Sequence, residues 1–397
     1  MNFSENSLLR NTRFLQLWVG QGISFVGDAI SMVALVILVA QIAGSASAVG
    51  GVLVARLLPT LASPLLGVLA DRVDRRAILV ASDLARAALV LGVAFTRDLV
   101  TIYVLAFLMG ASRALFDPTV RAAFPSVVGR GDLTRANALI GGTFSASIMI
   151  GPALGGLLVA AVGVEAAFAL DAATYLVSAA LLSRIPLPRP GTGEDEGFVR
   201  ELQAGLSYLA GARVPLGIVV GGFLSMLATD LATPAEVFLA KETFGAGDVG
   251  YGLLVSLWGV GMVLGSALIA ALGDKVNLMA AYFSCLFVWA LAFAGAGLAP
   301  TFGLALGALA VAGAANGVDN AATDTILQKR VPDAFLGRVF SVRLLGFGAG
   351  EVLAYPAGGL IVDAFGPRSS YLLAGMATAA VGFLVLIFIF AVPTKRI

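Results

Sequence analysis

The sequence predicts an all-α polytopic membrane protein. Of its 397 residues, 59% are hydrophobic and only 12% are charged, whereas soluble globular chains average about 45–50% apolar and about 25% charged residues. The mean hydropathy is +0.96, and the apolar residues form long continuous runs that suit membrane-spanning helices. This composition excludes a soluble enzyme, a disordered protein and a nucleic-acid-binding protein.

Residue usage excludes several kinds of chemistry. The chain has no histidine and a single cysteine, Cys285, so histidine-based catalysis, an intramolecular disulfide and a thiolate zinc site are excluded. The formal net charge of +1 provides no basic surface for nucleic acid. None of the lysines completes a phosphate-binding loop, which excludes ATP hydrolysis. We therefore expect no enzyme activity, no metal and no cofactor.

Twelve apolar runs are long enough to cross about 30 Å of hydrocarbon as helices, which takes roughly 20 residues each. The predicted spans are 14–43, 48–70, 77–96, 99–122, 135–162, 167–185, 214–240, 248–273, 277–298, 301–324, 338–362 and 369–392.

The positive charges predict how these spans are oriented. Most Lys and Arg residues fall on alternate loops, and the loops of the other side hold only Arg97, Lys241 and Arg368. Cytoplasmic loops carry the excess of Lys and Arg. We therefore predict a multi-pass protein of a prokaryotic cell membrane with both termini in the cytoplasm.

The chain is predicted to be two pseudo-symmetric bundles of six helices. Residues 152–163 align with 356–366, and Asp28 in the first span falls opposite Asp230 in the seventh. The predicted domains are residues 1–185, a cytoplasmic linker at 186–213, and residues 214–397. Apolar residues at helical spacing favour an amphipathic helix over 197–212 of the linker; the alternative is a solvated linker.

The loop after the second span resembles a signature of the major facilitator superfamily, Gly67-Val-Leu-Ala-Asp71-Arg72-Val-Asp74-Arg75-Arg76. Asp74 stands where the pattern usually has Gly, so we expect a different turn or cap there. The resemblance implies a latch that holds the two halves together on the cytoplasmic side, with Asp71 facing the start of span 11 and Arg75 paired with Asp117. The implied latch residues are Gly67, Asp71, Arg72, Arg75, Arg76, Asp117, Arg338 and Arg343.

A second motif resembles that of the drug/proton antiporters within the same superfamily. Span 5 carries Gly151-Pro152-Ala153-Leu154-Gly155-Gly156, which matches their Gly-Pro-x-x-Gly-Gly pattern and implies export rather than import. Further stretches, including Ser24-x-x-Gly27-Asp28, are similar to the exporter branch that holds macrolide-efflux proteins and the enterobactin exporter. The resemblance covers essentially the whole chain.

Three carboxylates lie deep in predicted spans: Asp28, Asp230 and Glu351. A charged side chain at the bilayer centre costs at least about 2.5–3.5 kcal/mol, so each is a functional candidate. Proton coupling requires a group that titrates near neutral pH, and without histidine only a desolvated carboxylate can do this. We predict that these three include the proton-coupling site, with Asp28 first. The alternative is a hydrogen bond that packs helices, or a conformational latch.

Other residues within the spans are candidates for binding substrate. Arg56 has no partner in its own span and could bind an anionic group or a carboxylate across a cavity. Asp83 and Arg86, and likewise Arg113 and Asp117, are spaced to pair on one helix face. The predicted substrate-binding set is Arg56, Arg113, Phe25, Phe144 and Trp258, although lipid-facing positions are an alternative for the aromatic residues.

Together these observations predict a secondary active transporter that expels amphipathic drugs or small organic molecules by proton antiport and alternating access. Alternatives are export of a siderophore, movement of a lysophospholipid between leaflets, or a non-transporting sensor on the same fold. The expected partners are a small-molecule substrate, protons and the lipid bilayer, with no nucleic acid, and the expected oligomeric state is a monomer.

Overall fold

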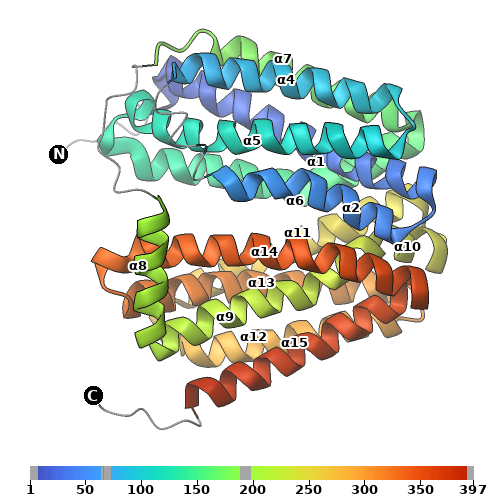
Figure 1. The fold of residues 1–397 in the computed structure, drawn as a ribbon, viewed down its shortest axis with the longest axis vertical. Helices are drawn as coiled ribbons and strands as arrows, with labels where there is room; N and C mark the ends of the chain where they lie inside the picture. The colour runs from blue at the N-terminus through green and yellow to red at the C-terminus, as the bar shows by residue number, and fades with distance from the viewer. Residues whose placement is uncertain (1–7, 64–65, 67–72, 188–197, 391–397) are drawn as a thin grey trace. The chain divides into compact units, whose positions relative to one another are not determined.

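The computed structural model describes residues 8–63, 66, 73–187 and 198–390, and these are almost entirely helical (Figure 1). In that part of the chain, eleven helices are long and apolar enough to cross a membrane, and a shorter apolar helix covers Ala46–Ala62. The short helix lies where the span 48–70 was predicted, and most of the rest of that span is outside the described residues. The predicted all-α polytopic class is confirmed.

The chain divides by its internal packing into two compact units. Unit 1 comprises Met1–Ala43 and Ala55–Glu194, and unit 2 comprises Gly44–Val54 and Asp195–Ile397. The predicted domains differ from this division in two ways: the first half of α2 (Ala46–Leu57) packs with unit 2, and the predicted linker at 186–213 is divided between the two units.

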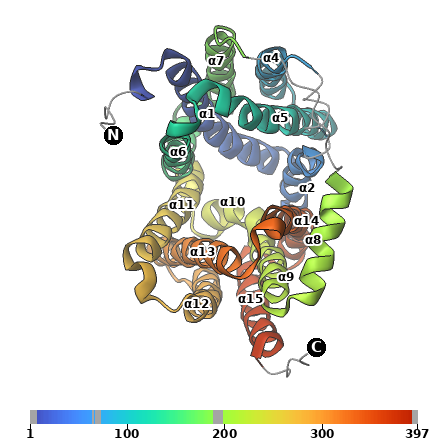
Figure 2. The same ribbon diagram turned by 90° about the vertical axis from the view of Figure 1, so that its left-hand side faces the viewer.

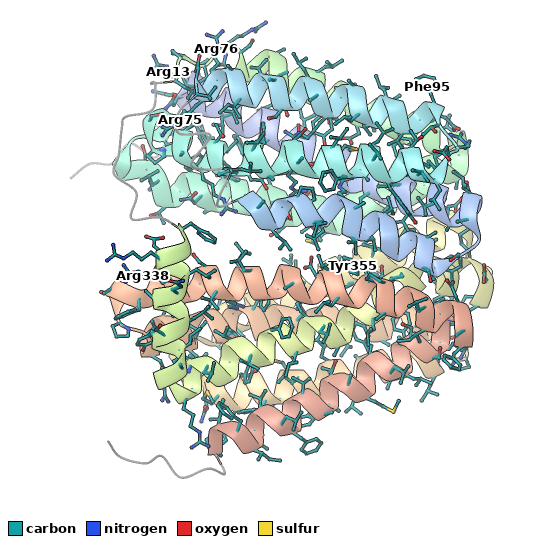
Figure 3. All side chains as sticks on the ribbon, viewed as in Figure 1. Arg13, Arg75, Arg76, Phe95, Arg338 and Tyr355 are labelled. Atoms are coloured by element: carbon teal, nitrogen blue, oxygen red, sulfur yellow. The ribbon has the colours of Figure 1, made fainter. Side chains whose placement is uncertain are left out.

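Unit 1 is built on two sets of packed helices. Helix α1 packs against α6 and α7, and α4 packs against α5 and α7. Arg13, Arg75 and Arg76 lie at one end of this unit and Phe95 lies at the opposite end (Figure 3). Besides the end of α2 with its 3₁₀ continuation Leu58–Ala62, the unit contains α1 (Thr12–Ala43), α4 (Arg75–Phe95), α5 (Leu99–Val128), α6 (Leu133–Val162) and α7 (Val164–Leu182).

Besides the first half of α2, unit 2 contains the predicted amphipathic helix, α8 (Phe198–Gly211). Its helices α9, α11, α12, α13, α14 and α15 are seen nearly end-on in Figure 2. Helix α13 packs against α11 and α12, while α9 packs against α14 and α15. The remaining helices are α9 (Arg213–Thr229), α10 (Glu236–Phe238), α11 (Gly247–Leu272), α12 (Leu278–Leu298), α13 (Phe302–Arg330), α14 (Asp333–Phe365) and α15 (Pro367–Phe390).

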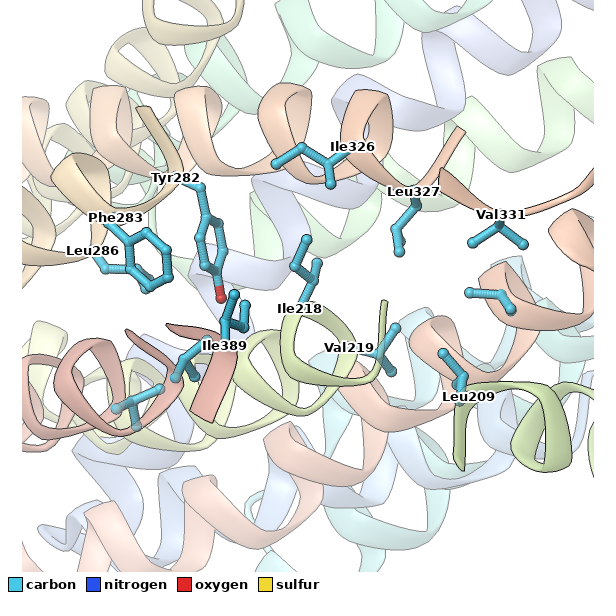
Figure 4. Close-up of a cluster of buried hydrophobic side chains, with 13 residues drawn as sticks. Leu209, Ile218, Val219, Tyr282, Phe283, Leu286, Ile326, Leu327, Val331 and Ile389 are labelled. Atoms are coloured by element: carbon cyan, nitrogen blue, oxygen red, sulfur yellow. The ribbon is translucent and has the colours of Figure 1, made fainter. Parts of the chain in front are cut away.

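A buried apolar cluster joins α8, α9, α12, α13, α14 and α15 of unit 2 (Figure 4). Ile218 of α9, Leu286 of α12, Leu327 of α13 and Ile389 of α15 all belong to it. Leu209 of α8 is only 1% exposed in the same cluster. A helix thus covers most of the range 197–212 in the linker, and part of its apolar face is buried in unit 2.

Glycines bring α11 and α13 into backbone contact. A Cβ atom at Gly261 or Gly265 of α11 would press on a carbonyl oxygen of α13, and one at Gly313 or Gly317 of α13 would press on a carbonyl oxygen of α11. Small residues four apart let membrane helices approach in this way. The two helices therefore form one closely packed pair, and it carries one wall of the cavity described below.

The first turn of α2 is held by a carboxylate of α14. Asp363 accepts hydrogen bonds from the backbone N–H groups of Ala46 (2.7 Å) and Ser47 (3.1 Å) and from the hydroxyl groups of Ser45 (2.8 Å) and Ser47 (2.5 Å). A carboxylate at a helix N-terminus satisfies backbone donors that have no partner inside the helix. This cap explains why Gly44–Val54 packs with unit 2.

Several helices extend beyond their predicted spans. The predicted span 99–122 continues to Val128, 301–324 continues to Arg330, and 338–362 begins at Asp333. Hydropathy reports only the part of a helix that is apolar on all sides, whereas a helix continues into polar surroundings as long as its backbone bonds and one packed face persist.

Candidate functional site

Unit 1 contains an ion pair between two residues that the sequence suggested for different roles. The Arg56 guanidinium lies 3.0 Å from the Asp28 carboxylate, and the Tyr175 hydroxyl donates to the same oxygen at 2.5 Å. The side chains of Arg56 and Asp28 are 13% and 16% exposed. Three helices, α1, α2 and α7, thus meet at Asp28, and Arg56 has the carboxylate partner that its own span lacks.

A second pair lies behind Tyr175. Arg86 pairs with Asp83 on α4, as their spacing predicted, and both are buried. The Arg86 guanidinium also lies over the rings of Phe116 (4.1 Å) and Tyr175 (4.5 Å). Cations over aromatic rings are attracted by the ring quadrupole. Tyr175 therefore connects the two ion pairs, a role that sequence reasoning missed because tyrosine carries no charge.

Asp171 was also missed by sequence reasoning. It is fully buried on α7, and the Thr174 hydroxyl donates to it at 3.3 Å. Its carboxylate lies so close to Gly27 of α1 that a Cβ there would contact it. The predicted span 167–185 placed Asp171 near a helix end, whereas α7 begins at Val164. The available signal was an acidic residue within an apolar run.

The remaining candidates of unit 1 pair with each other or pack beside this cluster. Arg113 pairs with Asp117 at 3.3 Å on α5, as predicted. The rings of Phe25 and Phe144 pack edge to face, with their centroids 5.3 Å apart. Four residues of the motif on α6 are buried, namely Gly151, Pro152, Gly155 and Gly156. Gly151 packs against Ala29 and Gly155 against Ile30, next to Asp28.

The latch implied by the family signature is only partly described. Gly67, Asp71 and Arg72 lie outside the described residues. Asp74 caps α4 by accepting a hydrogen bond from the backbone N–H of Arg76, which accounts for an aspartate in place of the usual glycine. The Arg75 guanidinium donates to the backbone carbonyl of Ala122 at 3.2 Å.

The latch candidates of unit 2 lie on α14. Arg343 is buried, pairs with Asp324 of α13 and lies over the Phe347 ring at 4.7 Å. Arg338 lies over the Phe335 ring at 5.7 Å, and Arg338 and Tyr355 lie toward opposite ends of the helix (Figure 3).

The seventh span, predicted as one helix over 214–240, is broken in the structure. Helix α9 ends at Thr229, a 3₁₀ helix covers Asp230–Ala235, and a π-helical turn covers Leu239–Thr243. Pro234 lies in the 3₁₀ segment, where it lacks the N–H that an α-helix would use. Residues three apart eclipse one another in 3₁₀ geometry, so Asp230, Thr233 and Glu236 line up on one face.

That face borders a cavity inside unit 2. The cavity has a volume of about 430 Å³ and is lined by residues of α9, α10, α11, α12, α13, α14 and the 3₁₀ segment. Its lining contains four carboxylates and, among the described residues, neither lysine nor arginine. They are Asp230, Glu236, Asp319 and Glu351. The structure thus brings together two of the three predicted coupling residues and adds two acidic residues, Glu236 and Asp319.

Aromatic and amide side chains complete the lining. Trp258 and Met262 lie on α11, and their backbone carbonyl groups contact Gly313 and Gly317 of α13. Asn316 and Asn320 lie on α13 beside these contacts. Trp289 of α12 is 3% exposed, and its indole N–H has no hydrogen-bond partner within the described chain. The cavity therefore combines carboxylates, aromatic faces and an indole N–H without a hydrogen-bond partner in the described chain. In the described part of the chain, no group of three His, Cys, Asp or Glu residues is arranged to hold a metal ion.

Comparison with known proteins identifies what this arrangement is similar to. The sequence profile of the transmembrane secretion effectors matches residues 3–396. Macrolide efflux protein A of Streptococcus pyogenes is 24% identical, over 91% of this chain and 92% of that protein. The enterobactin exporter EntS of Escherichia coli O1:K1 / APEC is 28% identical, over 69% of this chain and 66% of that protein.

The fold itself matches solved transporters. The crystal structure of the nucleoside transporter NupG superposes with a TM-score of 0.78 at 13% identity, covering 95% of this chain and 98% of that chain. At this identity the match shows a shared fold alone.

Proposed function

Because the chain belongs to the transmembrane secretion effectors of the major facilitator superfamily, we propose that it is a proton-coupled exporter of amphipathic small organic molecules. It is a multi-pass membrane transporter with exporter relatives, and it is not an enzyme. The proposal adds the driving ion and the kind of substrate, and it keeps the expectation of a monomer in a prokaryotic cell membrane with both termini in the cytoplasm.

The observation that carries the proposal is the carboxylate cluster of the unit 2 cavity. Asp230 and Glu351 line the cavity, and neither takes part in an ion pair in the described chain. A carboxylate without a fixed cationic partner can exchange a proton without breaking a salt bridge. Transporters of this architecture alternate access by rocking of their two repeats around a central site. Substrate and proton would then bind at Asp230 and Glu351 in turn.

Asp28 has a different role in this proposal from that of the cavity carboxylates. Its carboxylate is paired with Arg56 and Tyr175, so protonation there would leave the Arg56 guanidinium without its partner. Such a change would alter the contacts among α1, α2 and α7. We assign Asp28 to the conformational step that follows proton binding.

Transport into inverted membrane vesicles tests the coupling. Vesicles containing the full chain would be energised so that the lumen is acidic, and uptake of erythromycin, ethidium and enterobactin would be measured with and without a protonophore. We expect uptake of at least one compound that the protonophore abolishes and that Asp230→Asn and Glu351→Gln prevent. Glu165→Gln, at a half-exposed ion pair with Arg97, is the matched control. Uptake that survives collapse of the gradient contradicts the proposal.

A further inference from the structure

The charge balance of the unit 2 cavity restricts which substrates it can hold; this inference rests on the proposed function and concerns the same site. Asp230, Glu236 and Glu351 line the same cavity, and none of them takes part in an ion pair within the described chain. The fourth carboxylate, Asp319, has a positive charge nearby in Arg343. A buried charge requires a partner or a proton. A cationic occupant would provide these three carboxylates with a partner, whereas an anionic occupant would provide none.

The walls of the cavity are suited to an organic cation. Trp258, Trp289 and Phe293 line it together with Phe347, and aromatic faces attract cations, tryptophan most strongly. The volume of about 430 Å³ falls in the range of roughly 300–1,000 Å³ that holds drug-sized ligands. The described acidic residues are not arranged as a metal site, which favours an organic cation over an inorganic one.

Two buried polar groups provide an independent indication of a ligand. The Trp289 indole N–H and the Ser225 hydroxyl both line the cavity and have no hydrogen-bond partner within the described chain. The two residues are 3% and 2% exposed. Buried polar groups are normally paired, so these two are available to an occupant. The indole N–H can only donate, which calls for an acceptor on the ligand.

We infer that the unit 2 cavity binds a drug-sized organic cation that also carries a hydrogen-bond acceptor. The positive charge lies among Asp230, Glu236 and Glu351, the apolar body lies against Trp258 and Phe293, and the acceptor faces the indole N–H of Trp289. Anionic substrates, such as deprotonated catechols, are excluded from this cavity.

Equilibrium binding with two isosteric probes tests the charge requirement. Tetraphenylphosphonium and tetraphenylborate have nearly the same size and apolar surface and opposite charge. We expect the purified full chain in detergent to bind the cation, and to bind the anion at least about tenfold more weakly, a difference of about 1.4 kcal/mol. Equal binding of the two probes, or tighter binding of the anion, overturns the inference.

Variants locate the binding. We expect Glu351→Gln and Asp230→Asn each to weaken tetraphenylphosphonium binding about tenfold, and Asp333→Asn, an exposed carboxylate on α14, to leave it unchanged. Thermal melting of each variant verifies that it is folded, and Glu236→Gln serves as a replacement for any that is not. If none of the three cavity variants, when folded, binds the cation more weakly, the inference is overturned.

The two proposals fail in different ways. Binding in detergent involves no proton gradient, so cation binding together with protonophore-insensitive transport would refute the coupling and support the inference. Protonophore-sensitive export of an anion by a chain that does not bind tetraphenylphosphonium would refute the inference and support the coupling.

Discussion

The guanidinium of Arg56 lies 3.0 Å from the carboxylate of Asp28, and together they connect α2 to α1 inside unit 1. Tyr175 of α7 adds a hydrogen bond to the same oxygen. Each partner stabilises a charge that would otherwise lie within an apolar bundle. The pair is therefore a structural element as much as a functional one.

Removing one member of this pair is expected to be worse than removing both. Arg56→Gln or Asp28→Asn alone leaves a largely buried charge without its partner. We expect each single variant to lower the free energy of unfolding by about 1–3 kcal/mol. The double variant should recover part of that loss. Thermal unfolding of the three variants, analysed as a double-mutant cycle, measures the coupling. Additive effects would contradict the prediction.

The glycine contact between α11 and α13 predicts a steric effect. In Gly313→Ala the new methyl group would press on the backbone oxygen of Trp258, and overpacking costs typically 1–3 kcal/mol. Gly307→Ala on the same helix meets nothing within 4 Å and should be neutral or slightly stabilising. We expect a lower melting temperature for the first variant alone. Equal melting temperatures would show that the contact can relax.

The break in span 7 predicts a loss of transport without a loss of folding. Pro234→Ala restores a backbone donor and permits an α-helix through Asp230–Ala235. Asp230 and Glu236 would then no longer share one face, because residues six apart are rotated by about 120° from each other in an α-helix. We expect reduced transport with an unchanged melting temperature. Pro125→Ala, within α5, is the control for a generic proline effect, and full transport by Pro234→Ala would refute this account of the break.

Trp289 predicts a difference between ligands. Trp289→Phe keeps an aromatic face and removes only the indole N–H, so tetraphenylphosphonium, which has no acceptor, should bind as before. Rhodamine 6G, a cation with an ester carbonyl, should bind about threefold to tenfold more weakly, as expected for one hydrogen bond. Trp18→Phe is the matched control, since Trp18 donates to Thr143 in unit 1. An equal effect on both ligands would show that the N–H does not contact the acceptor.

Much of this architecture could be predicted from the sequence because the membrane imposes simple rules. Runs of apolar residues predicted the helices, and Asp230 and Glu351 stood out as acidic residues within such runs. The pairing of Asp28 with Arg56 could not be predicted, because the facing of a uniformly apolar helix is not determined by its pattern.

The geometry of the seventh span could not be predicted either. Pro234 was visible in the sequence, but a proline in a membrane helix can produce a kink, a 3₁₀ turn or a π turn. The choice among these depends on the packing of α9 and the 3₁₀ segment against α14. The importance of Glu236 follows from that choice, because only the 3₁₀ geometry aligns it with Asp230.

The backbone contact between α11 and α13 has a consequence for how the substrate range of this transporter can change. Four glycines set the separation of these helices, so the position of the wall does not depend on the larger side chains that project from it. Val255, Trp258 and Met262 on α11 can therefore be replaced without displacing the scaffold. Under selection by a new toxic compound, specificity should evolve by single substitutions at these three positions, while the glycines stay constant.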